Sequence, residues 1–215
     1  MLMDQYPFSK KEFENLVRRE AAARKVSFVR ALYMVSDGLT ERWRKEHREI
    51  KPICQKGCSF CCHQIATCTA IEWEEIVPFV MRQKKLFRKR LHKMRGKWLW
   101  YLERNQNRLV SDPEKLLDDW RGTPCIFLGG DGGCLIYDVR PLQCRTLDSS
   151  KACVSWHQPE VRKYHFLWEG FAYILLEEEQ ERLGREGEGG SLINLASRME
   201  SSQCVSRYIP GRPLP

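Results

Sequence analysis

The positions of apolar side chains along the chain predict a mostly helical protein. In the first third, apolar residues recur at steps of four, three, four and four from Phe28 to Trp43, which places them on one face of a helix. Upstream, Ser9 and Glu12 have the spacing of a capping box, in which a hydroxyl and a carboxylate satisfy free N–H groups at a helix start. We therefore expect helices over most of residues 9–48.

The middle of the chain predicts a second helical region. Thr69 and Glu72 repeat the capping-box spacing, and Pro78 predicts a kink or a split in the helix that they start. Beyond the proline, a second apolar stripe steps by four, three, four and four from Phe87 to Leu102. Lysine and arginine occupy the other faces of this helix, so the stripe is expected to be buried and the charges solvated.

The last part of the chain mixes helices with the one convincing strand signal. A helix start is expected at 111–120, a long helix over 159–183 and a last short helix over 191–199. Two short apolar runs, 125–128 and 134–137, flank the glycine-rich sequence GGDGG and predict a small hairpin. The fold class that follows is mostly α, a helical protein with an irregular Cys-rich metal-binding centre and one short β-hairpin.

The same pattern predicts how the chain is divided. We expect a single domain over 1–205, because no linker-like or low-complexity stretch interrupts it. Its cysteine-cluster core covers about 50–155 and lies between helical flanks over 9–48 and 159–200. The proline-rich stretch 206–215 is expected to be a flexible tail.

Composition narrows the class of protein. The 215 residues include 42% apolar and 30% charged residues, a balance typical of globular chains. No stretch approaches the roughly 18 consecutive apolar residues of a membrane span, and the first 13 residues hold no apolar signal-peptide core. We therefore expect a cytoplasmic protein without membrane association. Thiols stay reduced in that compartment, so clustered cysteines there more often bind metal or do chemistry than form disulfides.

The positive charge is concentrated in one segment. The chain carries 36 Lys and Arg against 28 Asp and Glu, a net charge of +8, but residues 82–108 alone hold eleven basic residues and one acid. With Trp98, Trp100 and Tyr101 among them, these residues could bind nucleic acid. A solvated helix with a buried stripe is the favoured interpretation. The partner expected for this basic helix is an unknown protein or another acidic surface, and nucleic acid is possible but not favoured.

Ten cysteines are the outlier of the composition, and most of them fall in two clusters. Thiolates are the ligands that zinc and iron–sulfur clusters prefer, and each such site needs about four protein ligands. Eight candidates therefore fill two sites, or one site with spare or catalytic thiols. The candidate ligands are Cys54, Cys58, Cys61, Cys62, Cys125, Cys134, Cys144 and Cys153. The two remaining cysteines, Cys68 and Cys204, are interpreted as structural or incidental.

Local spacing adds detail to the first cluster and the hairpin. Neighbouring side chains of an extended chain point in opposite directions, so Cys61 and Cys62 are expected to serve different sites, or one of them to face a substrate. The predicted hairpin would bring Cys125 and Cys134 close enough to bind one metal. A histidine could complete a Cys3His site, with His63 beside the first cluster as one candidate.

Two arginines bracket the last of the hairpin-side thiols. Arg140 and Arg145 flank Cys144, and a tetrathiolate site carries net negative charge that guanidinium groups would offset. We therefore treat both as candidate cofactor-binding residues. The alternative, ordinary surface pairing with Asp138 or Asp148, is equally consistent with the sequence.

The strings CQKGCSFCC and CIFLGGDGGCLIYDVRPLQCR resemble the CxxCxxCC cysteine-cluster (YkgJ-like) family of zinc- or iron-chelating proteins. The resemblance covers about residues 50–155, and its most specific element is Arg-Pro-x-x-Cys-Arg at 140–145. It implies metal binding by the eight cysteines named above. The sequence departs from the family in the spacing after Cys54 and in Ile126, where members usually have proline.

The resemblance also shapes the expected function. It favours an iron–sulfur cluster, of the 4Fe-4S type, over zinc, in a cytosolic protein with a redox or accessory role. One alternative is a zinc-stabilised module that binds nucleic acid or a partner protein. Another is a cluster-dependent protein-modifying enzyme, since one branch of the family resembles the lysine N-methylases that use S-adenosylmethionine. No glycine-rich nucleotide loop supports that branch here, and whether the protein is an enzyme is left open.

Overall fold

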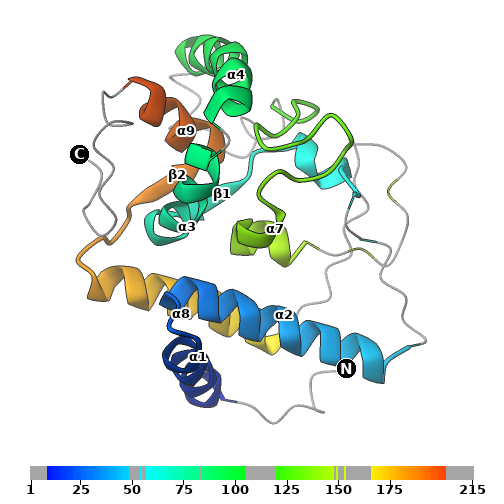
Figure 1. The fold of residues 1–215 in the computed structure, drawn as a ribbon, viewed down its shortest axis with the longest axis vertical. Helices are drawn as coiled ribbons and strands as arrows, with labels where there is room; N and C mark the ends of the chain where they lie inside the picture. The colour runs from blue at the N-terminus through cyan, green and yellow to red at the C-terminus, as the bar shows by residue number, and fades with distance from the viewer. Residues whose placement is uncertain are drawn as a thin grey trace.

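A computed structural model gives the fold of the protein. It describes residues 9–48, 54, 57–82, 84–104, 120–147, 149, 153 and 166–201. Over these residues the protein is mostly helical, with an irregular cysteine-rich region and one two-stranded antiparallel sheet (Figure 1), which confirms the predicted fold class. None of the described helices is both long and apolar enough to cross a membrane.

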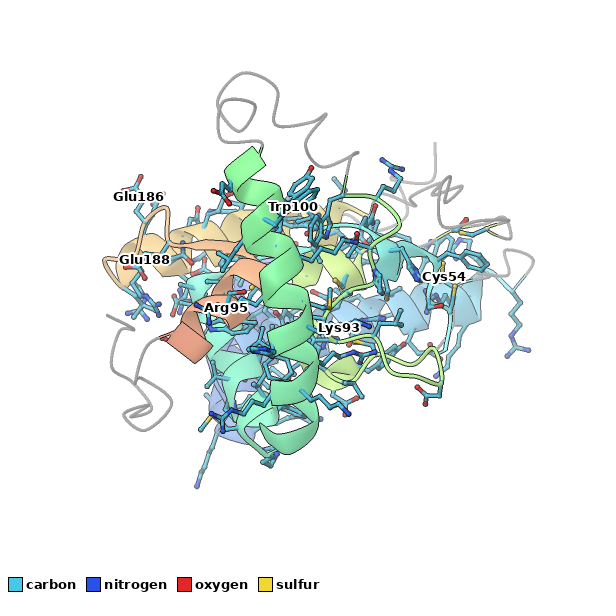
Figure 2. The ribbon with its side chains drawn as sticks, turned by 90° about the horizontal axis from the view of Figure 1, so that it is seen from above. Cys54, Lys93, Arg95, Trp100, Glu186 and Glu188 are labelled. Atoms are coloured by element: carbon cyan, nitrogen blue, oxygen red, sulfur yellow. The ribbon has the colours of Figure 1, made fainter. Side chains whose placement is uncertain are left out.

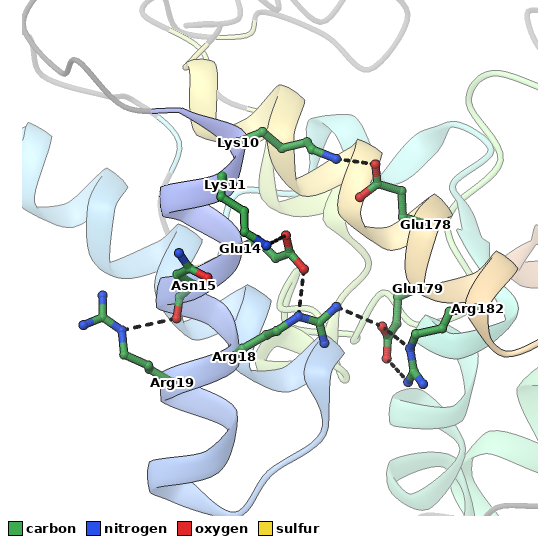
Figure 3. Close-up of polar contacts among 9 residues, drawn as sticks. All are labelled: Lys10, Lys11, Glu14, Asn15, Arg18, Arg19, Glu178, Glu179 and Arg182. Carbon is green, nitrogen blue, oxygen red and sulfur yellow. Dashed lines mark hydrogen bonds and ion pairs between the residues drawn. The ribbon is translucent and has the colours of Figure 1, made fainter.

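The first helical layer contains α1 (Lys10–Arg24), α2 (Phe28–Glu46) and α8 (Leu167–Arg182), which lie together at the bottom of Figure 1. The capping box at Ser9 and Glu12 starts α1 as predicted. Apolar side chains from all three helices form one core, which includes Phe13, Leu32, Trp43, Trp168 and Leu175. Ion pairs join α1 to α8 at the surface of this layer (Figure 3).

The second layer contains α3 (Ala70–Arg82), α4 (Lys84–Arg104) and α9 (Leu192–Ser201). The predicted capping box at Thr69 and Glu72 starts α3. Pro78 does not split this helix, which continues to Arg82. The stripe predicted for the basic helix is buried: Phe87 and Trp98 belong to a second core with the apolar residues of α3 and α9.

The sheet joins two segments that are far apart in the sequence. Strands β1 (Thr67–Thr69) and β2 (Gly189–Ser191) pair antiparallel, with Cys68 opposite Gly190. Strand β2 was not predicted from the sequence, because Gly-Gly-Ser has no apolar alternation. Gly189 is nevertheless required: a Cβ there would lie 2.6 Å from the Cys68 carbonyl oxygen, and its φ of +147° disfavours other residues.

The predicted hairpin is reduced to a single bridge. Leu128 and Cys134 form one antiparallel bridge, and the Leu135 N–H donates to the Phe127 carbonyl at 2.8 Å. Gly132 lies in the turn with a φ of +80°, a conformation that glycine adopts without strain. Two short helices follow, η3 (Tyr137–Val139) and α7 (Leu142–Arg145).

Some predictions fall outside the described residues. They are the helix start at 111–119, the first part of the long helix at 159–165, the tail at 206–215 and Cys204. Where the last two helices are described, the predicted long helix is α8 and the predicted short helix is α9.

Candidate metal centre

Six of the eight predicted ligand cysteines line one small cavity beside the second core. The first cluster reaches it from a 3-10 turn, η2 (Phe60–His63), and its upstream loop, and the second cluster reaches it from the hairpin and α7. The six cysteines are Cys58, Cys61, Cys62, Cys125, Cys134 and Cys144. The volume, about 60 Å³, is far below the roughly 300–1,000 Å³ of a pocket for an organic ligand. The cavity therefore suits a small or inorganic group.

Backbone hydrogen bonds hold the two clusters together. The Cys125 N–H donates to the Cys62 carbonyl oxygen at 2.6 Å, and the Gly122 N–H donates to the His63 carbonyl oxygen at 2.7 Å. These bonds involve only backbone atoms and join segments about sixty residues apart in the sequence. The sequence could not predict that these two segments pair, because neither has the alternation of a strand.

The double cysteine has a backbone conformation that the sequence did not predict. Cys61 and Cys62 lie in the 3-10 turn η2 and not in extended chain, so the argument that their side chains diverge does not apply. Both line the same cavity, and their side chains are hydrogen-bonded to each other. That hydrogen bond, together with burial, raises the pKa of the Cys61 thiol above its ordinary range.

The sulfur atoms of two hairpin cysteines interact with backbone N–H donors. The Phe127 N–H donates to the Cys125 sulfur at 3.5 Å, and the Ile136 N–H interacts in the same way with Cys134. Such donors favour the thiolate, but burial outweighs them at both residues. Burial raises the pKa of Cys125 to about 12 and also raises the pKa of Cys134.

Four of the thiols interact electrostatically with one another. Cys61, Cys125, Cys134 and Cys144 form six pairs, and in every pair the charge of one thiolate raises the pKa of its neighbour. At Cys144 burial is the largest cause, followed by the other three thiols. Because each thiolate charge raises the pKa of the others, the four thiols ionise together only where a cation neutralises them, and metal ligands of this kind give up their protons on binding.

Arg140 brings positive charge to this set. Its guanidinium lines the cavity, lies 4.1 Å above the Tyr137 ring and lowers the pKa of Cys61, Cys134 and Cys144 against the effect of their burial. The Nε atom of Arg140 is buried and has no hydrogen-bond partner among the residues that the structure describes. A buried donor without a partner is costly, so an acceptor in the cavity would stabilise it.

Arg145 has a different role. Its side chain is only 6% exposed, and it donates to the carbonyl oxygens of Asp138 and Arg140 and pairs with Asp37 of α2. Its guanidinium also lies 4.1 Å above the Tyr33 ring. Arg145 thus fixes the loop that carries the thiols against the first helical layer, and it does not line the cavity.

The buried carboxylate of Glu72 links the elements that surround the centre. From the sequence it was identified only as a helix cap. Glu72, 3% exposed, accepts hydrogen bonds from the Leu142 N–H at 2.7 Å and from the Tyr33 hydroxyl at 2.8 Å. It therefore joins α3 to α2 and to α7, which carries Cys144. Burial and the Glu72 charge raise the pKa of Tyr33 far above its ordinary value.

Three predicted or possible ligands do not line the cavity. Cys54 and Cys153 are half-buried elsewhere, and Figure 2 shows Cys54 well away from α4. The His63 Nδ1 atom lies 3.0 Å from the Ser59 carbonyl oxygen. Among the described residues, no three cysteine, histidine, aspartate or glutamate side chains are arranged to hold one metal ion. The thiols share a cavity without forming a ligand set for a single ion.

A larger cavity, of about 640 Å³, opens beside the sheet and α8 and shares Gln143 with the thiol cavity. The Gln143 side chain accepts hydrogen bonds from the N–H and hydroxyl of Thr67 in β1. Three carboxylates that line this cleft, Glu177, Glu181 and Glu186, have no ion pair within the described part of the chain. The cleft is therefore acidic, and a ligand that carries positive charge would be complementary to it.

Comparison with known proteins gives one match. The CxxCxxCC family model, described as "Putative zinc- or iron-chelating domain", matches residues 53–166, more than half of the chain. The matched segment contains all eight predicted ligand cysteines. No curated protein and no solved structure matches the chain.

Proposed function

The chain belongs to the CxxCxxCC family of zinc- or iron-chelating domains, and on that premise we propose that it holds an iron–sulfur cluster of the 4Fe-4S type. The proposed ligands are the four mutually interacting thiols, Cys61, Cys125, Cys134 and Cys144. Bound there, the cluster would supply one-electron redox chemistry. The observation that carries the proposal is the convergence of these four buried thiols with Arg140 on one small cavity.

The number of thiols at the cavity is compatible with a cluster. A 4Fe-4S cluster and a structural zinc each need about four protein ligands, and six cysteines line this cavity. Four of them interact electrostatically with one another, so a full set of cluster ligands is available there.

Arg140 fits the charge of such a group. A cluster held by four thiolates is anionic, and a guanidinium beside it offsets the charge. The buried Nε donor of Arg140, which has no hydrogen-bond partner in the described part of the chain, would meet acceptors on the cluster or its sulfur ligands. Cys58 and Cys62 line the same cavity and are proposed as neighbours of the ligand set.

The proposed role is redox or accessory, in the cytoplasm. The thiol cavity is too small for an organic substrate, and its walls include the apolar residues Phe127, Ile136 and Leu192. An apolar wall and partial burial are among the features that set a cluster's potential. Neither electron transfer nor an accessory role in a larger enzyme requires a substrate pocket at the cluster itself.

The proposal is tested by metal analysis on protein purified without air. Cys134→Ser and Cys144→Ser are expected to lose most of the iron together with the acid-labile sulfide. Cys54→Ser and Cys153→Ser test whether the ligands are limited to the cavity, and are expected to keep both. Cys204→Ser, outside the cluster motifs, is the control for the loss of a thiol as such.

Two results would overturn this assignment. Zinc bound without sulfide in the wild-type protein would exclude the cluster. Loss of iron in Cys54→Ser or Cys153→Ser as complete as in Cys144→Ser would extend the ligand set beyond the cavity. Circular dichroism on every variant separates loss of metal from loss of the fold.

A further inference from the structure

The net charge of the protein resides on one helix. Helix α4 holds nine lysines and arginines and one glutamate, a charge of +8, which equals the net charge of the whole chain. All other residues therefore sum to zero. The apolar stripe of α4 is buried against the core, so these cations are not what attaches the helix to the protein.

Many cations elsewhere on the surface have acidic partners. Lys10 and Arg18 of α1 pair with Glu178 and Glu179 of α8 (Figure 3), and Arg185 pairs with Glu74 and Glu188. Further pairs within single helices are Lys11–Glu14, Arg24–Glu20, Arg42–Glu46, Lys45–Glu41 and Arg182–Glu179. Much of the surface charge of α1, α2 and α8 is thus neutralised by neighbouring side chains.

The outer face of α4 differs from these surfaces. Within the described part of the chain, Arg88, Lys89 and Lys93 are exposed and make no ion pair or hydrogen bond. Beside them Leu99 is 48% and Trp100 54% exposed. These five residues are called the basic face below. Figure 2 shows α4 toward the viewer, with Lys93 and Trp100 labelled along it.

The helical spacing places charge and aromatic surface on one line. Lys89, Lys93, Gly96 and Trp100 follow at steps of four, three and four, so they lie on one side of α4 over about 16 Å. Gly96 has open space where a side chain would be, which leaves a shallow gap between the lysines and the indole. A polyanion that also carries aromatic rings would be complementary to this row of lysine and tryptophan side chains.

We propose that the basic face of α4 binds single-stranded nucleic acid. Lysines contact phosphates of the backbone, and a half-exposed tryptophan stacks on a base irrespective of its identity. This inference is independent of the metal centre and does not require a cluster.

Two other acidic partners fit the basic face less well. Protein interfaces are depleted in lysine, because ordering its long side chain is costly, whereas lysine suits phosphate contacts. A helix that lies in a membrane surface buries its apolar stripe in lipid, but the stripe of α4 is buried in the protein core. A nucleic acid is therefore the partner that would contact both the lysines, through its phosphates, and Trp100, through its bases.

The test is fluorescence anisotropy of the full-length, metal-loaded protein with labelled 20-nucleotide oligo(U) and oligo(dT), over a series of salt concentrations. Affinity should fall steeply with salt. Lys89→Gln with Lys93→Gln should reduce the slope of log K against log salt by about 1.4, which is roughly 25-fold in affinity at 0.1 M salt. Trp100→Ala should weaken binding by roughly 5- to 150-fold, the range for loss of one stacked base.

The matched control is Lys11→Gln with Lys45→Gln, which removes the same charge from exposed lysines that pair with glutamates. It should leave binding within about twofold. Binding that does not respond to salt, or an equal loss in the control, would overturn the proposal. So would poly-glutamate that competes as well as oligo(U) while Trp100→Ala has no effect, because that result assigns the face to an acidic protein.

Discussion

The helical layer of α1, α2 and α8 and the cysteine centre reach their stability by different means. In the helical layer, apolar stripes fill a common core and surface cations pair with carboxylates of the same layer. In the centre, short turns are held by a few backbone hydrogen bonds around buried thiols with raised pKa values. Many polar groups of the first region are paired within the layer, whereas the second region contains buried thiols with raised pKa values and an Arg140 donor without a hydrogen-bond partner among the described residues.

The largest expected difference between the regions comes from metal removal. Metal binding free energy is folding free energy at thiolate sites, about 10–16 kcal/mol for structural zinc peptides, so stripping the metal should loosen the centre before the helices. Hydrogen exchange should rise in residues 57–66 and 120–147 and stay low in α1, α2 and α8. Uniform loss of protection, or no loss anywhere, would contradict the division.

The second prediction concerns a core substitution in the layer of α1, α2 and α8. Phe13 is fully buried between α1 and α8, so Phe13→Ala should cost about 3–5 kcal/mol in the free energy of unfolding. Metal content per folded chain should not change. Denaturant unfolding followed by metal analysis checks both, and Leu167→Ala, at a residue 36% exposed on α8, is the control expected to cost far less. If Phe13→Ala lost metal while still folded, the helical layer and the cysteine centre would not be independent.

The smallest expected effect separates the two arginines of the Arg-Pro-x-x-Cys-Arg motif. Arg140→Gln should weaken metal retention by roughly 10- to 100-fold, as loss of a supporting residue does at metal sites, with little change in the fold. Arg145→Gln should cost about 1–3 kcal/mol of stability, because it removes the side-chain donor to the Arg140 carbonyl oxygen and one of the two arginine donors to the Asp138 carbonyl oxygen. Chelator competition and thermal melting measure the two effects. Identical behaviour of the variants would refute the assignment of separate roles.

The sequence predicted what depends on local periodicity. The stripes of α2 and α4 and the capping boxes at Ser9 and Thr69 gave the helices, because each rests on residues a few positions apart. The β1–β2 pairing was missed, since strand β2 is Gly-Gly-Ser and its partner lies more than a hundred residues away. No local signal specifies such a contact.

At the candidate centre the sequence identified the chemistry but not its arrangement. Clustered cysteines and the family resemblance gave the thiols, yet spacing alone could not show that six of the eight line one cavity. Arg140 and Arg145 looked equivalent on either side of Cys144. They differ because a short helix, α7, directs Arg145 toward Tyr33 and Asp37, while Arg140 precedes it and remains beside the thiols.

The most direct test of the central claim is the amount of iron and acid-labile sulfide per chain, measured on wild-type protein purified without air. The account predicts about four of each, the content of one 4Fe-4S cluster, with a brown colour from sulfur-to-iron absorption. A colourless protein with one or two zinc ions and no sulfide would contradict it.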